Sequence, residues 1–315
     1  MKEIDIIVPC YNEEEGIEYF YQTVKQLVSE IKNYAFTFIF VNDGSVDGTL
    51  CKLRSLAGKD SAVKYLSFSR NFGKEAAMYA GLEYSSGDYA VIMDADLQDD
   101  PLLLTEMTKA MEEGYDCCAT RRMDRKGEPR IRSWFARRFY RLMNRFTDVE
   151  LIDGARDYRM MTRQMVQAIL KVRERERFSK GIFGWVGFRY KWLEYTNRER
   201  VYGTTKWSFW SLFRYAVGGI VAFSTMPLKL FMALGGGISV CALLFMMYKI
   251  IKTLVLGVDV PGYASIVVLI TFLGGMNLFA TGMVGLYLGN VYSEVKKRPI
   301  YILRESNFDE RKEKQ

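Results

Sequence analysis

Residues 1 to about 120 alternate short apolar runs with stretches in which apolar and polar residues recur at helical spacing. The apolar runs are predicted β-strands, and they are Ile4–Val8, Phe36–Val41, Val63–Leu66 and Tyr89–Met93. The stretches between them are predicted helices, at about residues 14–32, 47–58 and 73–85. Strands that alternate with helices indicate an α/β fold with a mostly parallel sheet and helices on both faces.

Two later segments are almost wholly apolar. The run from Leu228 to Tyr248 is interrupted only by Lys229 and Ser239, and the run from Tyr263 to Val291 has no charged residue. Because a helix needs roughly 20 apolar residues to cross the bilayer core, the pattern predicts two transmembrane helices, at about 228–251 and 263–290. Two buried core helices are the alternative, which the complete α/β domain before them disfavours.

The charges around this helical hairpin predict its orientation. Lys296, Lys297 and Arg298 follow the second helix, and a basic domain precedes the first. Since Lys and Arg gather on the cytoplasmic side, we expect a multi-pass protein of the cell membrane with the α/β domain and both termini in the cytoplasm. Lys249 and Lys252, near the short link between the helices, weaken this expectation slightly.

The predicted organisation has four parts. An α/β domain occupies residues 1–205, a juxtamembrane segment 206–227, the helical hairpin 228–291 and a cytoplasmic tail 292–315. The tail is rich in charge after Ile302 and is expected to be solvated and partly disordered.

Two stretches with many aromatic residues are predicted to lie at the membrane surface. At about 131–146, Arg residues fall between apolar and aromatic positions at helical spacing, as in a basic amphipathic helix of the headgroup region. The juxtamembrane segment resembles an aromatic belt before a membrane span. A surface helix packed on the sheet is the alternative for the first stretch. RNA binding can use the same residue types, but the adjacent hairpin favours lipid, and no nucleic-acid partner is expected.

Composition limits the chemistry. The chain has 44 Lys and Arg against 37 Asp and Glu, a net charge of +7 that favours anionic partners. It contains no histidine, which excludes Ser-His-Asp and Cys-His catalysis and any metal site with His ligands. The five cysteines are odd in number and form no Cys-x-x-Cys pair, so neither a zinc site nor a disulfide framework is indicated.

The turn Asp94-Ala95-Asp96-Leu97-Gln98 directly follows the fourth predicted strand. In open α/β sheets, ligands bind at the carboxyl ends of the strands. Alternate residues share a side, so Asp94, Asp96 and Gln98 can face one ligand. Oxygen donors of this kind suit Mg²⁺ or Mn²⁺. A solvated turn is the alternative explanation of so short a motif.

Two further loops follow strands at the same predicted edge. Pro9-Cys10-Tyr11-Asn12-Glu13-Glu14 follows the first strand, and Asn42-Asp43-Gly44-Ser45 follows the second. Asp43 can accept hydrogen bonds from a uracil or ribose, and Tyr11 can stack on a base. A turn or helix cap is the alternative for each loop. The chain shows neither a dinucleotide fingerprint nor a Walker sequence.

Taken together, these motifs resemble those of the inverting glycosyltransferases of family 2. The segments that carry the resemblance are Val8–Glu14, Val41–Ser45, Ser69–Glu75 and Asp94–Asp99. More narrowly, the chain resembles the polyprenyl-phosphate glycosyltransferases, which include bactoprenol glucosyltransferases of the GtrB type and dolichol-phosphate mannose synthase. This closer resemblance covers nearly the whole chain and extends through Arg177–Gly181, Thr205–Trp207 and Val258–Tyr263.

The resemblance implies a GT-A fold and a metal-dependent, inverting sugar transfer with Mg²⁺ or Mn²⁺. The implied donor is a UDP-sugar, with UDP-glucose leading and UDP-GlcNAc or GDP-mannose as alternatives. The implied acceptor is polyprenyl (undecaprenyl) phosphate at the cytoplasmic face of the lipid bilayer. The product would be a lipid-linked sugar that donates to a glycan. Relatives also form homo-oligomers, which we expect here.

The resemblance also implies roles for individual residues. Asp94, Asp96 and Gln98 match the metal and donor-diphosphate site. The matching nucleotide-sugar positions are Pro9, Tyr11, Glu13, Asp43 and Lys206. The positions expected at the acceptor phosphate are Arg121 and Arg137. Asp157 is expected to be catalytic, by orienting the acceptor or a basic residue. It lies in Ala155-Arg156-Asp157-Tyr158-Arg159, where the family commonly has Gly-Asp-Phe-Arg. The alternative for Asp157 is a structural pairing with Arg156 or Arg159.

The expected chemistry needs no histidine. A metal at Asp94 and Asp96 would stabilise the charge that develops on the leaving diphosphate. The lipid phosphate is already an anion at neutral pH, so it can attack without a dedicated base. Two other functions stay open: a processive polysaccharide synthase, which would usually show Gln-x-x-Arg-Trp and more membrane helices, and a non-catalytic membrane scaffold, against which the intact Asp94, Asp96 and Gln98 argue.

Overall fold

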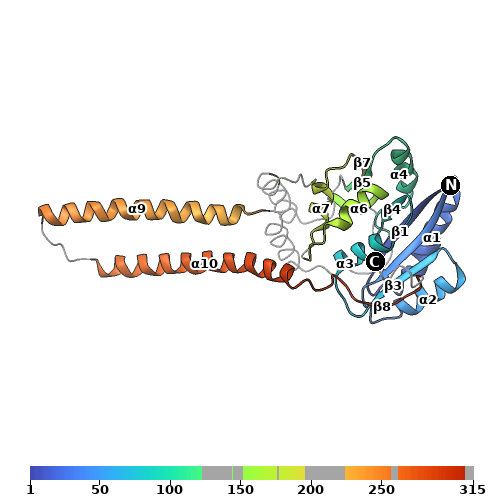
Figure 1. The fold of residues 1–315 in the computed structure, drawn as a ribbon, viewed down its shortest axis with the longest axis horizontal. Helices are drawn as coiled ribbons and strands as arrows, with labels where there is room; N and C mark the ends of the chain where they lie inside the picture. The colour runs from blue at the N-terminus through green and yellow to red at the C-terminus, as the bar shows by residue number, and fades with distance from the viewer. Residues whose placement is uncertain (123–143, 145–151, 176, 196–223, 257–261, 309–315) are drawn as a thin grey trace. The chain divides into compact units, whose positions relative to one another are not determined.

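The structure is a computed structural model that describes residues 1–122, 144, 152–175, 177–195, 224–256 and 262–308 (Figure 1). The chain divides into two compact units. The first consists of Met1–Gly219 with Arg298–Gln315, and the second of Ile220–Lys297. The basic amphipathic helix predicted at about 131–146, the link at 257–261 and nearly all of the juxtamembrane segment lie outside the described residues, apart from Asn144 and residues 224–227.

The described part of the first unit contains one mixed sheet in the strand order β7-β5-β6-β4-β1-β2-β3-β8. Its strands are β1 Lys2–Cys10, β2 Tyr34–Asn42, β3 Val63–Phe68, β4 Tyr89–Ile92, β5 Cys117–Arg122, β6 Ala155–Thr162, β7 Tyr190–Tyr195 and β8 Leu303–Ser306. The described helices of this unit are α1 Ile17–Glu30, α2 Thr49–Lys59, α3 Lys74–Tyr84, α4 Leu103–Glu112, α6 Arg163–Lys171 and α7 Ser179–Trp185. The four predicted strands and three predicted helices are confirmed, each with ends shifted by a few residues.

The centre of the sheet is parallel, as its sequence pattern predicts. β1 pairs in parallel with β2 on one side and with β4 on the other, and β2 pairs in parallel with β3. Both faces of β1 are covered: Ile6 belongs to the main apolar core, and Ile7 packs against α3. Helix α3 lies so close that a Cβ on Gly81 would stand 2.1 Å from Cγ2 of Ile7. Continuous burial of this kind explains why β1 is an unbroken apolar run.

The second half of the sheet has a different pairing. β6 runs antiparallel to both β4 and β5, and Ile92 of β4 lies opposite Arg159 of β6. β7 then pairs in parallel with β5 at the edge. Because β6 runs against β4, residues just before Arg159 lie beside residues just after Ile92. This register brings residue 157 next to the Asp94 turn.

The C-terminal segment corrects one expectation. Directly after Ile302, in place of a solvated segment, the structure contains β8, which pairs antiparallel with β3 at the edge of the sheet. Residues 309–315 lie outside the described residues. Glu305 of β8 forms an ion pair with Arg54, and the ring of Tyr301 stacks on Phe68 at 4.9 Å between centroids. Strand pairing satisfies the backbone groups that the edge of β3 would otherwise expose. Charge content alone predicted the opposite, because the partners of this strand lie more than 200 residues earlier.

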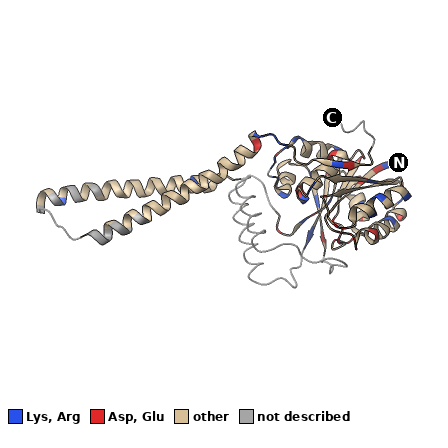
Figure 2. Cartoon of the chain, turned by 90° about the horizontal axis from the view of Figure 1, so that it is seen from below, with Lys and Arg blue, Asp and Glu red and all other residues tan. Residues whose placement is uncertain are grey.

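The second unit contains two long helices, α9 Met226–Leu256 and α10 Tyr263–Val295. Within them, Met226–Phe245 and Phe272–Val295 are long and apolar enough to cross a membrane, and none of either stretch is buried inside the protein. Figure 2 shows few charged residues along either helix. The two predicted apolar helices are therefore present, and they fit a membrane protein.

Candidate active site

The predicted metal turn presents its oxygen donors on one side. Ala95 and Leu97 are buried in the main apolar core, whereas Asp94, Asp96 and Gln98 are only half-buried. Leu97 adopts a left-handed φ of 52°, and the N–H of Gln98 donates to Oδ1 of Asp96 at 3.2 Å. Burial of the alternate apolar residues thus holds two carboxylates and an amide away from the core. Among the described residues no cluster of three His, Cys, Asp or Glu exists that could hold a metal, so this mixed set stays a prediction. Its donor chemistry fits a hard divalent cation.

Lys74, the first residue of α3, connects this turn to β6. Its Nζ lies 2.7 Å from Asp94 and 2.7 Å from Asp157. Although burial opposes the charge, the two carboxylates raise the pKa of Lys74. Burial would likewise raise the pKa of Asp157, but the ammonium groups of Lys74 and Lys180 outweigh it and lower that pKa. Lys74 and Asp157 are therefore both ionised at neutral pH, and the ammonium of Lys74 lies between the carboxyl groups of Asp94 and Asp157.

Sequence reasoning missed this role of Lys74. The residue stands in the segment that carried the family resemblance, yet the partners it touches are 20 and 83 residues away. The partners predicted for Asp157 in a structural role were also different. Arg156 lies near Asp99, at 3.9 Å, and the guanidinium of Arg159 donates to the backbone carbonyls of residues 156 and 157. The ion-pair partner of Asp157 is Lys74, because the antiparallel register of β6 determines which side chains meet.

The loops after β1 and β2 are joined to each other. The N–H of Asn12 donates to the hydroxyl of Ser45, and its side-chain oxygen accepts from the N–H of Val46. The N–H of Glu13 donates to the hydroxyl of Thr49 at 2.9 Å. Asn12 itself has a left-handed φ of 54°. These bonds place the half-buried Pro9, Tyr11 and Glu13 at the carboxyl end of β1, where a nucleotide site is predicted.

Asp43 occupies a buried position at the end of β2. Its carboxylate accepts the N–H groups of Phe72, at 2.6 Å, and Gly73, at 2.9 Å. Burial raises the pKa of Asp43 to about 6, against the opposing effect of these two bonds. Gly44 beside it has a φ of 64°, and a Cβ there would stand 2.3 Å from the backbone of Arg70. Asp43 therefore fixes the loop that leads into Lys74, in addition to its predicted role in nucleotide binding.

The predicted acceptor arginines and Lys206 are only partly within the described structure. Arg121 lies on β5, donates to the carbonyl of Asp153 at 3.2 Å and is 3.8 Å from Glu194. Arg137 and Lys206 lie outside the described residues. The structure thus brings together Asp94 and Asp157 through Lys74, and it does not show what Arg121 would share with Arg137.

Asp99 is a buried residue of the acidic segment for which the sequence predicted no role. The hydroxyl of Tyr195 donates to its carboxylate, and Arg156 lies nearby. Burial raises the pKa of Asp99 to about 6, although Arg156 acts in the opposite direction. The contact ties the end of β7 to the turn that bears Asp94 and Asp96. Asp99, which directly follows Gln98, therefore helps to hold the acidic turn in place.

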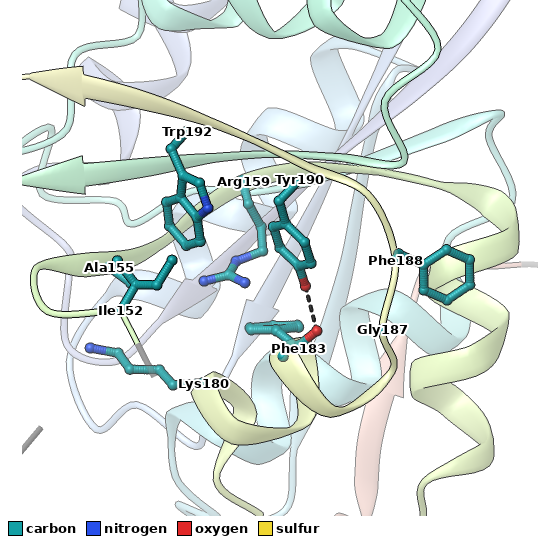
Figure 3. A pocket seen from close by; sticks show the side chains of 10 residues that line it. Ile152, Ala155, Arg159, Lys180, Phe183, Gly187, Phe188, Tyr190 and Trp192 are labelled. Atoms are coloured by element: carbon teal, nitrogen blue, oxygen red, sulfur yellow. Dashed lines mark hydrogen bonds between the residues drawn. The ribbon is translucent and has the colours of Figure 1, made fainter. Parts of the chain in front are cut away.

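A cavity of about 300 Å³ lies between β6, α7 and β7. Figure 3 shows Arg159, Lys180 and the rings of Phe183, Tyr190 and Trp192 around it, with the hydroxyl of Tyr190 donating to the carbonyl of Phe183. Sequence reasoning did not find this cavity, because its walls come from segments that are separate in the chain. The only signal was the segment Arg177–Gly181, which carried part of the resemblance without an assigned role.

A mixed sheet with an acidic turn and interlaced loops at the carboxyl edge of its parallel strands is the arrangement of a GT-A glycosyltransferase. The sequence profile of glycosyl transferase family 2 matches residues 5–170. The chain belongs to this family, and it is a glycosyltransferase. The resemblance seen in the sequence motifs is confirmed.

Full-length relatives narrow the comparison. The chain is 44% identical to CsbB of Bacillus subtilis over 97% of this chain and 92% of that protein. The name of CsbB describes it as a glycosyltransferase. It is 40% identical to the SfII prophage-derived bactoprenol glucosyl transferase of Shigella flexneri, over 97% and 98% of the two chains. The structure of glucosyl-3-phosphoglycerate synthase from Mycobacterium tuberculosis superposes with a TM-score of 0.46 at 19% identity, over 70% of this chain and 78% of that chain. This chain thus matches a bactoprenol glucosyl transferase, a member of the predicted subgroup, over nearly the whole length of both proteins.

Proposed function

We propose that this protein transfers glucose from a UDP-sugar to polyprenyl phosphate, with inversion, at the cytoplasmic face of the membrane. The observation that carries the proposal is the joined site of Asp94, Lys74 and Asp157 at the carboxyl edge of the sheet, in a chain with two helices of membrane-spanning length. The name of the Shigella relative supports glucose and bactoprenol as the transferred sugar and the acceptor class. Positive charge after α10 supports a cytoplasmic catalytic domain.

The acidic turn would hold the divalent cation of the reaction. Asp94, Asp96 and Gln98 would supply its protein ligands, and Mg²⁺ or Mn²⁺ bound there would act as a Lewis acid on the leaving diphosphate. Pro9, Tyr11, Glu13 and Asp43 would surround the nucleotide. Lys74 keeps Asp94 oriented through its ion pair. It also places a fixed positive charge beside the anionic donor.

The state of Asp157 fits an acceptor that needs no base. A phosphate monoester has its second pKa near 6, so it carries the attacking charge at neutral pH. Asp157 is ionised and paired with Lys74, and its lowered pKa makes it a weak proton acceptor. We therefore assign Asp157 a positioning role: it holds the ammonium of Lys74 between the acidic turn and β6.

A donor screen tests the proposed function. The protein in detergent or nanodiscs is incubated with Mg²⁺ or Mn²⁺, undecaprenyl phosphate and UDP-glucose, UDP-GlcNAc or GDP-mannose in turn. Mass spectrometry of the lipid fraction should show hexosyl-phosphoryl-undecaprenol with UDP-glucose. A product only with UDP-GlcNAc or GDP-mannose would overturn the choice of glucose. Absence of any lipid product with all three donors would overturn the proposed acceptor.

A further inference from the structure

We propose that the cavity between β6, α7 and β7 is the subsite for the headgroup of the lipid acceptor. In this assignment Lys180 contacts the phosphate, and Trp192 and Ile152 form an apolar wall for the first prenyl units. The inference rests on the proposed function, because it takes a prenyl phosphate as the acceptor. It differs from the expectation drawn from the resemblance, which placed the acceptor phosphate at Arg121 and Arg137.

The lining of the cavity selects the chemistry of its ligand. Of the described residues that line it, Arg159 and Lys180 are cationic and none is acidic. The other described lining residues are aliphatic, aromatic or glycine, among them Ile152, Phe183, Tyr190 and Trp192. A sugar ring would require side chains that accept hydrogen bonds from its hydroxyls, such as carboxylates or amides, and the described lining residues offer neither. Two cations beside aromatic and aliphatic groups instead fit an anion attached to an apolar body.

The two cations differ in how they are held. Arg159 is only 2% exposed, its guanidinium lies 3.8 Å from the centroid of the Phe183 ring, and it donates to two backbone carbonyls. It is therefore a fixed charge in the wall. Lys180 is half-buried on α7, and Figure 3 shows it among the residues that line the cavity. A lysine ammonium with three rotatable donors suits a phosphate whose position is set by the lipid attached to it.

The cavity adjoins the reaction centre through β6. Asp157 and Arg159 are two residues apart on this strand, about 7 Å along it. The pairing of β6 with β5 is irregular in this stretch, and both Ala155 and Arg159 line the cavity. Asp157 forms an ion pair with Lys74, and Arg159 lines the cavity. Both the N–H and the hydroxyl of Ser179, the first residue of α7, donate to Glu75, which is the neighbour of Lys74. The cavity thus lies beside the ion-paired site, because Arg159 in its wall is two residues from Asp157 on β6.

The position of the cavity residues in the sequence also supports an acceptor subsite that is separate from the donor site. The family profile ends at residue 170, and it includes the acidic turn, Lys74 and β6. Helix α7 and strand β7 follow that boundary, so the part of the cavity outside β6 is not part of the shared family region. A shared donor region followed by a separate wall is expected when the nucleotide-sugar chemistry is common and the acceptor differs.

Kinetics with a short-chain acceptor test the subsite. Farnesyl phosphate serves as the acceptor for the full chain in detergent, and KM is measured for it and for the UDP-sugar. The variants are Lys180→Gln and Trp192→Leu. The matched control is Lys191→Gln, because Lys191 lies between Tyr190 and Trp192 on β7, faces the opposite side and pairs with Glu113 at 2.5 Å. We expect Lys180→Gln to raise KM for farnesyl phosphate about tenfold or more, since a hydrogen bond to a charged group is lost.

The outcomes separate the subsite from the proposed function. Support requires that Lys180→Gln and Trp192→Leu raise KM for farnesyl phosphate while KM for the UDP-sugar and the Lys191→Gln control stay at parent values. An unchanged acceptor KM, or a rise only in the donor KM, would overturn the subsite even while the parent protein makes lipid product. Failure of the parent protein to glycosylate any prenyl phosphate would instead overturn the function itself.

Calorimetry without donor adds a readout independent of turnover. Farnesyl phosphate should bind the parent protein and lose affinity about tenfold in Lys180→Gln. Farnesol and inorganic phosphate, each titrated alone, should bind far more weakly, because each fills half of the proposed subsite. If farnesol binds as well as farnesyl phosphate, phosphate recognition at Lys180 is wrong. If inorganic phosphate binds equally well, the prenyl wall is wrong.

Discussion

The two sides of the proposed catalytic site differ in the charge of their side chains. On the donor side, the ends of β1, β2 and β4 present carboxylates, and the buried Asp43 is held by the N–H groups of Phe72 and Gly73. On the other side, the cavity of β6, α7 and β7 presents Arg159 and Lys180 among aromatic rings. An acidic edge takes an anionic diphosphate only with a cation between them, whereas a cationic cavity takes a phosphate directly. Under the two proposals, the charge of the receiving surface is what distinguishes the two substrates of the reaction.

Lys74 stands between these two sides. Its ammonium is shared by Asp94 of the acidic turn and Asp157 of β6. Without it, two carboxylates would face each other where the proposed donor and acceptor regions meet, and like charges at that distance repel. The following predictions test each side and the residue that joins them, from the largest expected effect to the smallest.

Loss of the acidic turn should have the largest effect. Asp96→Ala removes a proposed metal ligand, so we expect turnover to fall at least about 100-fold while the protein still inserts into membranes. The measurement is formation of lipid-linked sugar at saturating substrates, together with the thermal unfolding midpoint in detergent. Glu106→Gln, an exposed acid on α4, is the matched control and should keep parent activity. Near-parent turnover in Asp96→Ala would show that the turn is not the metal site.

Removal of the joining residue should have the next largest effect. Lys74→Met leaves Asp94 and Asp157 facing each other, and we expect destabilisation of roughly 1–3 kcal/mol, since the half-exposed pair is partly screened by solvent. Activity should fall as well, by about tenfold or more. Unfolding midpoints of Lys74→Met, Asp157→Asn and the double variant complete the test. If the two single effects simply add in the double variant, the two residues are not coupled.

The close packing beneath the site is a third test. Gly81→Ala places a Cβ against Ile7, at 2.1 Å from its Cγ2, so α3 must shift on β1. We expect destabilisation of about 1–3 kcal/mol. Because α3 begins at Lys74, activity should fall together with stability. Gly58→Ala on α2 is the control, since a Cβ there meets nothing within 4 Å. Equal unfolding midpoints for the two variants would contradict the close approach of α3 to β1.

The donor side should also show a pH dependence of stability that comes from Asp43. Burial raises the pKa of this carboxyl to about 6 in the folded protein, from about 4 when unfolded. The folded state therefore favours the protonated form, so the contribution of Asp43 is fully present below about pH 4 and is lost as pH rises through 6. Asp43→Asn removes this loss. The stability of the variant relative to the parent should rise by about 1–3 kcal/mol between pH 4 and 7. A constant difference across this range would contradict the raised pKa.

The smallest effect is expected far from the cavity, at the opposite edge of the sheet. Glu305→Gln weakens the ion pair of β8 with Arg54, which is exposed to solvent and screened by salt. We expect unchanged activity and a shift of the unfolding midpoint below about 2 °C. Tyr301→Ala is the contrasting variant, since it removes a ring stacked on Phe68 and a hydroxyl bonded to Glu83. A larger shift in Glu305→Gln than in Tyr301→Ala would show that the ion pair, and not the packed ring, holds this segment.

Much of the molecule was determined by local sequence pattern. The strands of the parallel sheet, the helices between them and the two long apolar helices follow from the spacing and length of apolar runs, which each segment carries by itself. The acidic turn was also evident, because Asp94 and Asp96 directly follow a buried strand. The physical reason is that periodicity and composition act over a few residues, within the reach of the segment that contains them.

Only the tertiary structure decided what these segments touch. The ion pair of Lys74 with Asp157, the bond of Tyr195 to Asp99 and the pairing of β8 with β3 join residues that are at least 83 positions apart. The cavity likewise depends on the antiparallel register of β6 against β4 and on the bond between Ser179 and Glu75. A register shift of one residue would turn Asp157 and Arg159 to the other face of the sheet. Residues able to bind ligands or take part in catalysis can thus be identified from the sequence, while strand register determines which of them form a site.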